Sequence, residues 1–212
     1  MLATRYKQAI DRAVHPMALR LARSGISPSA ITLAIPMLGL LVCWWFVRTR
    51  AVVPFCVLIV LVGSLDGLDG AVARAGGRVT KFGAYLDAMC DRYFESSVVL
   101  AVALVTGYWF WSIVVLAGSL MVSYAKARTA IEVSVSNTEW PDLMERTERG
   151  VLYLAGLAAA DRLSWKPIGR DLFWWTLVVV AILTHLTVIQ RVLRARRFIL
   201  ERDNIATPQS HR

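Results

Sequence analysis

Residues 66–91 read DGLDGAVARAGGRVTKFGAYLDAMCD and lie between two strongly apolar runs, residues 52–65 and 94–105. An ionised carboxylate inside a membrane segment costs roughly 2.5 kcal/mol or more on insertion scales. Four carboxylates at spacings of three and four residues in such surroundings indicate a cation site at a membrane surface, and such a site points to an enzyme. These carboxylates belong to Asp66, Asp69, Asp87 and Asp91.

The composition is that of a membrane protein. The chain has 212 residues, of which 57% are hydrophobic, and its mean hydropathy is +0.53. Soluble domains average about 45–50% apolar residues. The net charge is +9, but no aromatic-basic RNA-binding module is evident, so we expect no nucleic-acid partner. The length suits one domain, which we place at residues 1–202, followed by a polar tail at residues 203–212.

Apolar segments of spanning or near-spanning length predict an all-α membrane protein with six transmembrane helices. A span needs about 20 residues. The fifth segment is shorter than this, and its helix could extend back toward residue 146. The segments are residues 30–47, 52–74, 83–105, 109–125, 150–163 and 171–193.

Basic residues set the expected orientation. Most of the 24 Lys and Arg residues flank the span ends that lie on the same side as both termini and the aspartates. Because cytoplasmic loops carry the excess of Lys and Arg, we expect a multi-pass protein of the cytoplasmic (inner) membrane, with both termini and the aspartates facing the cytoplasm. The basic residues expected on the other side are Arg48, Arg50, Arg162, Lys166 and Arg170.

The first 23 residues carry an apolar stripe at helical spacing among basic residues. A helix of this kind can lie in the plane of the lipid headgroups. We therefore expect an N-terminal interfacial amphipathic helix at residues 1–23, although a soluble amphipathic arm would show the same pattern. The stripe consists of Tyr6, Ile10, Val14, Met17 and Leu21.

The aspartates can converge on one pocket. Helix positions three and four residues apart share a face, so Asp66 and Asp69 end one helix while Asp87 and Asp91 begin the next. A turn through residues 76–77 would make the two helices antiparallel neighbours. Clustered carboxylate oxygens suit Mg²⁺, Mn²⁺ or Ca²⁺ rather than zinc. A solvated turn and an ion pathway through the membrane are the alternatives.

The pattern resembles the full signature of the CDP-alcohol phosphotransferases, also named CDP-alcohol phosphatidyltransferases. The residues that carry the resemblance are Asp66, Asp69, Gly70, Ala73, Arg74, Gly83, Asp87 and Asp91. The resemblance covers nearly the whole chain and implies a homodimer with two divalent metal ions, Mg²⁺ with Mn²⁺ as the alternative, per active site. Such enzymes transfer a phosphatidyl-type group from a CDP-linked lipid to an alcohol and release CMP.

Carried over by position, the resemblance implies that Asp91 acts as general base on the attacking hydroxyl and helps to hold a metal. The other metal ligands would be Asp66, Asp69 and Asp87. The CDP pocket would be lined by Asp66, Asp69, Gly70, Arg74 and Gly83. The family often has Pro-Asn before its first span, and this chain has Pro28-Ser29 there.

A second set of polar residues is expected at the same membrane depth as the aspartates and would bind the acceptor alcohol. Its basic members would suit an alcohol with its own phosphate, because Arg binds phosphate in a forked geometry. The set consists of Ser123, Lys126, Arg128, Arg149 and Arg191. The strings around these residues resemble those of phosphatidylinositol-phosphate synthases, which implies inositol 1-phosphate as acceptor. We expect CDP-diacylglycerol as the donor, with an ether-linked CDP-lipid as the alternative.

Several alternatives stay open at this point. Glycerol 3-phosphate is the second candidate acceptor, and the basic residues could be ordinary membrane anchors. A cation transporter and a lipid-binding membrane scaffold are the two rival classes. Arg92 follows Asp91 and is expected to pair with a carboxylate or to reach the headgroups, and Glu95 lies one turn beyond Asp91.

Overall fold

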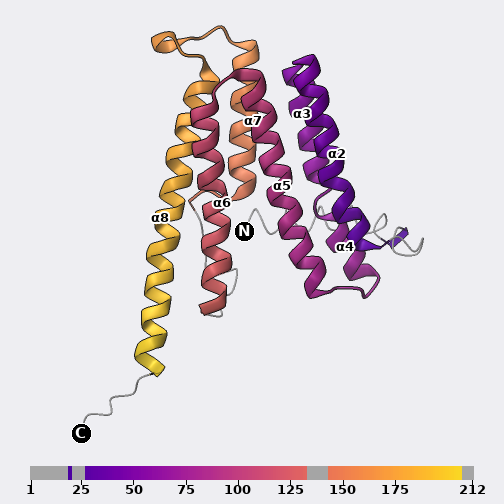
Figure 1. The fold of residues 1–212 in the computed structure, drawn as a ribbon, viewed down its shortest axis with the longest axis vertical. Helices are drawn as coiled ribbons and strands as arrows, with labels where there is room; N and C mark the ends of the chain where they lie inside the picture. The colour runs from indigo at the N-terminus through magenta and orange to yellow at the C-terminus, as the bar shows by residue number, and fades with distance from the viewer. Residues whose placement is uncertain (1–18, 21–26, 133–142, 207–212) are drawn as a thin grey trace. The chain divides into compact units, whose positions relative to one another are not determined.

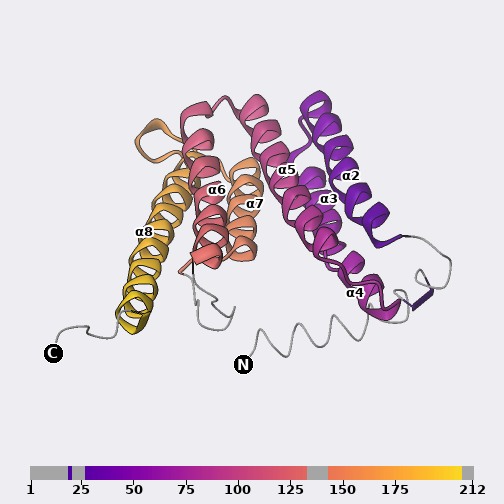
Figure 2. The same ribbon diagram turned by 60° about the horizontal axis from the view of Figure 1, so that its bottom comes forward.

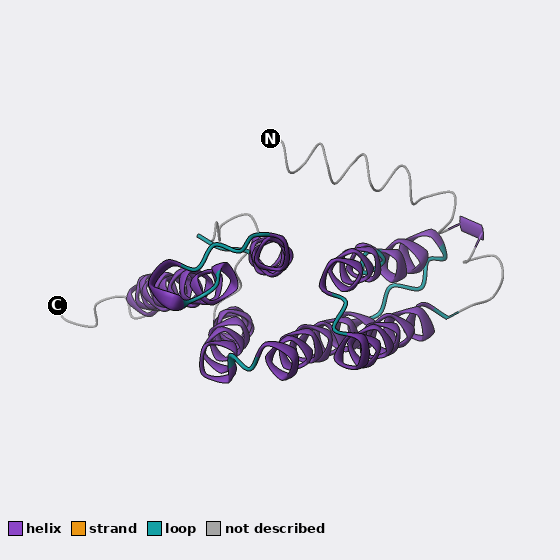
Figure 3. Ribbon diagram, turned by 90° about the horizontal axis from the view of Figure 1, so that it is seen from above, coloured by secondary structure: helices purple, strands orange, loops and turns teal. Residues whose placement is uncertain are grey.

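The computed structural model describes residues 19–20, 27–132 and 143–206, and within these ranges every regular element is helical (Figures 1 and 3). Within residues 27–132, loops of two to five residues join successive helices. The elements are α2 (Pro28–Thr49), α3 (Val52–Ser64), α4 (Leu68–Ala75), α5 (Lys81–Thr106), α6 (Trp109–Glu132), α7 (Arg146–Arg162), the 3₁₀ turn η2 (Pro167–Gly169) and α8 (Leu172–Ala206).

Four helical segments among the described residues are long and apolar enough to cross a membrane: Pro28–Thr49, Val52–Ala75, Trp109–Glu132 and Leu172–Arg202. Large apolar side chains cover their outer faces; Leu41 and Trp44, for example, are 63% and 64% exposed. Apolar surface of this extent on long helices fits a lipid environment. The protein is therefore a multi-pass membrane protein.

The predicted count of six spans is not confirmed, because α5 and α7 do not meet the same criteria. Helix α5 has 26 residues, but its N-terminal half carries charged side chains. Helix α7 has only 17 residues. It begins at Arg146, because Glu145 and Glu148 form a reciprocal capping box around its first turn.

The second predicted span is not one continuous helix. It breaks at residues 65–67 into α3 and α4, and Gly67 occupies the N-cap position of α4. The break leaves Asp66 between the two helices and Asp69 in the first turn of α4. An acidic side chain there interacts favourably with the helix dipole, which is one local reason for a new helix to start at this point.

The chain forms two compact units, Met1–Val105 and Thr106–Arg212. In the first unit α2 packs beside α3 and contacts α4 near its own N-terminal end (Figures 1 and 2). The rings of Phe46 and Phe55 stack with their centroids 3.9 Å apart, and both side chains are fully buried. The backbone of Gly39 in α2 lies directly against the ring of Phe94 in α5.

In the second unit α8 packs against both α6 and α7. Two glycines allow the close approach: a Cβ at Gly118 would lie 2.9 Å from Cγ2 of Thr184, and a Cβ at Gly156 would lie 2.7 Å from Cβ of Thr176. Phe173 fills the space between the helices, with the ring of Tyr153 edge-on at 5.3 Å.

A polar contact ties the N-terminal ends of α6 and α8. The hydroxyl of Tyr108 donates to Oδ2 of Asp171 at 2.7 Å, while Oδ1 of Asp171 accepts the backbone N–H of Trp174 at 2.8 Å. Burial and the adjacent carboxylate raise the pKa of Tyr108 to about 12. Both residues stand at the start of a helix, since the backbone carbonyl of Tyr108 accepts the N–H of Ser112 in the first turn of α6.

The predicted interfacial helix at residues 1–23 lies outside the described residues except for the helical residues 19–20. At the other end, α8 runs to Ala206, so the first four residues of the expected polar tail, 203–206, are helical.

Candidate active site

Three of the four aspartates come together in the first unit. Each of Asp66, Asp87 and Asp91 offers a carboxylate oxygen, and these oxygens all lie within 4.8 Å of one another. Asp66 comes from the break between α3 and α4, while the other two lie one turn apart on α5. All three side chains are half-buried.

This arrangement fits a divalent cation. Oxygen ligands lie about 2.0–2.6 Å from Mg²⁺ or Ca²⁺, so one ion can bridge oxygens separated by the observed distance. Like charges this close repel one another, and a bound cation removes that cost. The donor set contains only carboxylate oxygens, which selects hard ions such as Mg²⁺ and Mn²⁺.

Asp69 is turned to a different set of partners. It is 7% exposed. Its Oδ2 accepts from the hydroxyl of Thr32 at 2.5 Å, and its Oδ1 accepts from the backbone N–H of Gly70 at 2.6 Å. The structure therefore places Asp69 outside the group of three, held between α2 and the first turn of α4.

The remaining residues of the expected CDP pocket lie on the two helices that carry the aspartates. A Cβ at Gly70 would lie 3.3 Å from Nη1 of Arg74, so the guanidinium of this exposed arginine covers the glycine. The N–H of Gly83 donates to Oγ1 of Thr80 at 2.9 Å, and that of Ala84 to the carbonyl of Thr80 at 3.2 Å. Thr80 thus caps the start of α5, a role that its position before the helix could have suggested.

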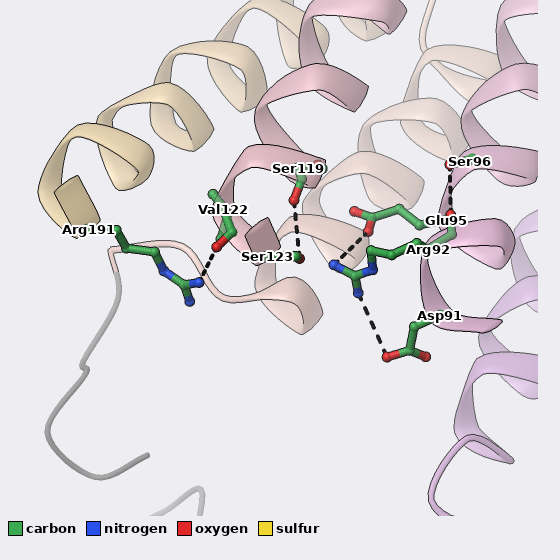
Figure 4. Close-up of polar contacts among 8 residues, drawn as sticks. All are labelled: Asp91, Arg92, Glu95, Ser96, Ser119, Val122, Ser123 and Arg191. Carbon is green, nitrogen blue, oxygen red and sulfur yellow. Dashed lines mark hydrogen bonds and ion pairs between the residues drawn. The ribbon is translucent and has the colours of Figure 1, made fainter. Parts of the chain in front are cut away.

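Arg92 pairs with carboxylates, as expected from its position. Its Nη2 lies 3.8 Å from Oδ2 of Asp91, and its Nη1 lies 3.6 Å from Oε2 of Glu95 (Figure 4). The guanidinium therefore lies between a carboxylate of the cluster and one a turn further along α5. Its charge offsets part of the negative charge that the cluster collects.

The five residues of the expected acceptor site all lie in the second unit. Arg149 on α7 and Arg191 on α8 are 3% and 6% exposed. Nη1 of Arg191 donates to the carbonyl of Val122 on α6 (Figure 4). Next to it, Oγ of Ser123 donates to the carbonyl of Ser119 at 3.3 Å. Two cationic side chains are therefore buried among the helices of this unit.

The other two basic residues of this set differ from the buried pair. Arg128 is exposed and forms an ion pair with Glu132 at 2.6 Å, and Lys126 is half-buried. Gln190, beside Arg191, accepts the N–H of Leu143 at 3.1 Å and so fixes the segment before α7 to α8. Sequence reasoning missed this contact, because no local pattern pairs residues so far apart in the chain.

Comparisons with known proteins identify the family of this chain. The model of one family, CDP-alcohol phosphatidyltransferase, matches residues 26–185. The archaetidylinositol phosphate synthase of Pyrococcus horikoshii is 34% identical over 195 residues, which cover 90% of this chain and 93% of that protein. The phosphatidylinositol phosphate synthase of Corynebacterium glutamicum is 30% identical over 216 residues, covering 98% and 95%.

Solved structures share the fold. The Mycobacterium tuberculosis phosphatidylinositol phosphate synthase with CDP-DAG bound superposes with a TM-score of 0.76 at 24% identity, covering 87% of this chain and 94% of that one. A structure of the same enzyme with manganese and citrate gives a TM-score of 0.75. The family match covers most of the chain, including Asp66, Asp69, Asp87 and Asp91, and the protein is therefore a transferase that belongs to the CDP-alcohol phosphatidyltransferase family.

Proposed function

We propose that this enzyme transfers the phosphatidyl group of CDP-diacylglycerol to inositol 1-phosphate, giving phosphatidylinositol phosphate and CMP. The observation that carries the proposal is the convergence of Asp66, Asp87 and Asp91 within 4.8 Å. Two relatives that align with nearly the whole chain support the acceptor, because both are named as synthases of an inositol phosphate lipid. CDP-diacylglycerol is proposed as the donor because relatives of this chain are named phosphatidylinositol phosphate synthases. An ether-linked CDP-lipid is the alternative donor.

In the proposed reaction an acceptor hydroxyl attacks the phosphorus that bears the lipid. A new oxygen–phosphorus bond forms, the diphosphate bond to CMP breaks, and CMP leaves with the electron pair. Asp91 takes the proton of the attacking hydroxyl, a contribution typical of general bases. Arg92, within 3.8 Å of Asp91, limits the rotation of this carboxylate by pairing with it.

Asp66, Asp87 and Asp91 would hold the divalent metal, with Asp69 as a further ligand if its carboxylate keeps one lone pair free for the ion. The proposed complement is two Mg²⁺ ions per active site, with Mn²⁺ able to replace them. Bound there, divalent cations neutralise charge on the diphosphate as CMP leaves.

The CDP moiety would bind along α4 and the start of α5. Asp66 and Asp69 would contact it, Gly70 and Gly83 would allow it to approach the backbone, and Arg74 would reach a phosphate. Arg74 is exposed, and its guanidinium lies beside Gly70 on the proposed nucleotide face. The same face would carry both metal and nucleotide.

The acceptor phosphate would bind to the basic residues of the second unit. A buried guanidinium is retained only where charge or hydrogen bonds compensate its desolvation, and Arg149 and Arg191 are both buried. With Ser123 and Lys126 they would form the phosphate pocket. Arg128 would join them only by releasing Glu132.

In the membrane, the enzyme would have six spans and an interfacial N-terminal helix. Helices α5 and α7 would be the fifth and sixth spans, in addition to the four apolar ones. Residues 1–202 would form one catalytic domain, and two copies of the chain would form a homodimer. The basic flanks favour an inner-membrane location with both termini and the active site on the cytoplasmic side.

The acceptor is tested by CMP release from CDP-diacylglycerol with inositol 1-phosphate, glycerol 3-phosphate, free inositol, serine and glycerol as separate acceptors. Release that depends on inositol 1-phosphate is expected. Release that depends only on glycerol 3-phosphate would support the phosphate-binding pocket but reject inositol 1-phosphate as the acceptor. Release only with an uncharged acceptor would overturn the pocket itself.

A further inference from the structure

A buried hydroxyl on α2 holds one of the signature aspartates. Oγ1 of Thr32 lies 2.5 Å from Oδ2 of Asp69, and the two residues are 4% and 7% exposed. They are 37 positions apart in the chain. The contact therefore depends on tertiary packing of α2 against α4.

The hydroxyl has two acceptors within reach and one proton to give. The carbonyl of Pro28, one turn earlier in α2, lies 3.1 Å from Oγ1 of Thr32. The carboxylate of Asp69 is closer, and a hydrogen bond to a charged acceptor is about twice as strong as one between neutral groups. The proton therefore goes to Asp69.

The two helices differ in how firmly they are fixed. Helix α2 starts at a defined cap, where Oγ of Ser27 accepts the N–H of Ala30 at 3.1 Å, and Pro28 occupies its first position. Helix α4 has only 8 residues and follows the break at residues 65–67. A short helix after a break needs tertiary contacts to fix its rotation. The Thr32 hydroxyl supplies one of these contacts at the aspartate itself.

Each carboxylate oxygen of Asp69 accepts one hydrogen bond and has room for a further ligand. One accepts from Thr32 and the other from the N–H of Gly70. A carboxylate oxygen has two lone pairs, so each oxygen can still face a ligand. The two donors fix the plane of the carboxylate and thereby decide which lone pairs point away from the protein.

We propose that Thr32 is a positioning residue for Asp69, and through Asp69 for the face of α4 that takes metal and CDP. This inference rests on the proposed function of the aspartate site. Partners that orient a metal-binding carboxylate typically contribute about 10- to 100-fold to metal affinity or activity. Thr32 thus belongs to the functional site through its hydrogen bond to Asp69.

The test compares Thr32→Val, which keeps the shape and removes the donor, with Thr32→Ser, which keeps the donor. The matched control is Thr184→Val on α8, a buried threonine that donates only to the carbonyl of Val180 one turn earlier. The purified full-length proteins are titrated with Mn²⁺ without lipid substrate, and free Mn²⁺ is followed by EPR. Unfolding temperatures are recorded in parallel.

Thr32→Val is expected to weaken Mn²⁺ binding about 10-fold or more, Thr32→Ser to restore most of it, and Thr184→Val to leave it unchanged. If Thr32→Val does not fold, Thr32→Ala is titrated in its place. Unchanged Mn²⁺ affinity in Thr32→Val or Thr32→Ala would overturn the inference, and so would equal weakening by Thr184→Val. Asp87→Asn distinguishes a failure of the proposed metal site from a failure of the positioning role of Thr32. If this variant binds Mn²⁺ as tightly as the wild type, the proposed metal site itself is wrong.

Discussion

The carboxylate of Asp66, at the break between α3 and α4, lies within 4.8 Å of the carboxylate of Asp91 on α5. The break explains how this happens. In a continuous helix Asp66 would lie on the helix side, whereas the break places it between two helix ends, where it can face α5. The cluster therefore depends on the backbone of residues 65–67 as well as on the acidic side chains.

Replacing Asp91 by Asn should reduce CMP release by about 10²- to 10⁴-fold, the usual contribution of a general base. Binding of the CDP-lipid should be mostly preserved, because Asp66 and Asp87 stay in place. Turnover and CDP-lipid binding are measured on the same preparation. Wild-type turnover in Asp91→Asn would exclude Asp91 as the base.

Replacing Lys126 by Ala should raise the KM for the acceptor more than the KM for the CDP-lipid. Removing a basic residue weakens the pocket for the acceptor phosphate. Arg128→Ala should have a smaller effect, since this side chain is already paired with Glu132. Arg197→Ala is the control, because Arg197 is 81% exposed and forms a similar ion pair with Glu201. Equal changes in both KM values would argue against an acceptor pocket here.

Tyr108 should make stability depend on pH in the alkaline range. Its pKa is raised from 10.0 to about 12 in the folded protein, so the folded state holds the phenolic proton more tightly than the unfolded state. The resulting contribution to the free energy of unfolding is fully present below about pH 10 and is lost as the pH rises from about 10 to about 12. The unfolding temperature of the wild type should therefore fall more steeply over this interval than that of Tyr108→Phe. Parallel curves would show that the Tyr108–Asp171 contact does not act in this way.

Gly156 should not tolerate a side chain. A Cβ there would meet the side chain of Thr176 on α8, and overpacking of this kind typically costs about 1–3 kcal/mol. Gly150 in the same helix has nothing within 4 Å of such a Cβ, and an alanine should be neutral or stabilising there. Unfolding temperatures in detergent compare Gly156→Ala with Gly150→Ala. A loss of stability only in Gly150→Ala would contradict the packing of α7 on α8.

The sequence predicted the helices and the acidic faces because both follow from local spacing. Asp87 and Asp91 share a face of α5 as their spacing of four requires. The apolar runs located the starts of α2, α6 and α8 to within two residues, but α6 and α8 end 7 and 13 residues later than expected. Of the expected CDP pocket, Asp69, Gly70 and Arg74 lie on α4 and Gly83 lies on α5, whereas Asp66 lies in the break between α3 and α4.

The sequence could not predict contacts that depend on packing between helices. The bond from Thr32 to Asp69 and that from Arg191 to the carbonyl of Val122 join distant residues, and no short motif encodes them. The break at residues 65–67 was missed because the apolar run continues up to Leu65 and the signature aspartates share a helical spacing. Gly67 was the available signal, since glycine weakens a helix interior by about 1 kcal/mol relative to alanine.

The most direct test of the account is the conversion of CDP-diacylglycerol and inositol 1-phosphate by the purified protein in detergent, with Mg²⁺ and with EDTA. The account predicts equal amounts of CMP and phosphatidylinositol phosphate with Mg²⁺, and neither product with EDTA or in Asp87→Asn. Product formation that is unaffected by EDTA and by Asp87→Asn would contradict the proposed role of the aspartate cluster.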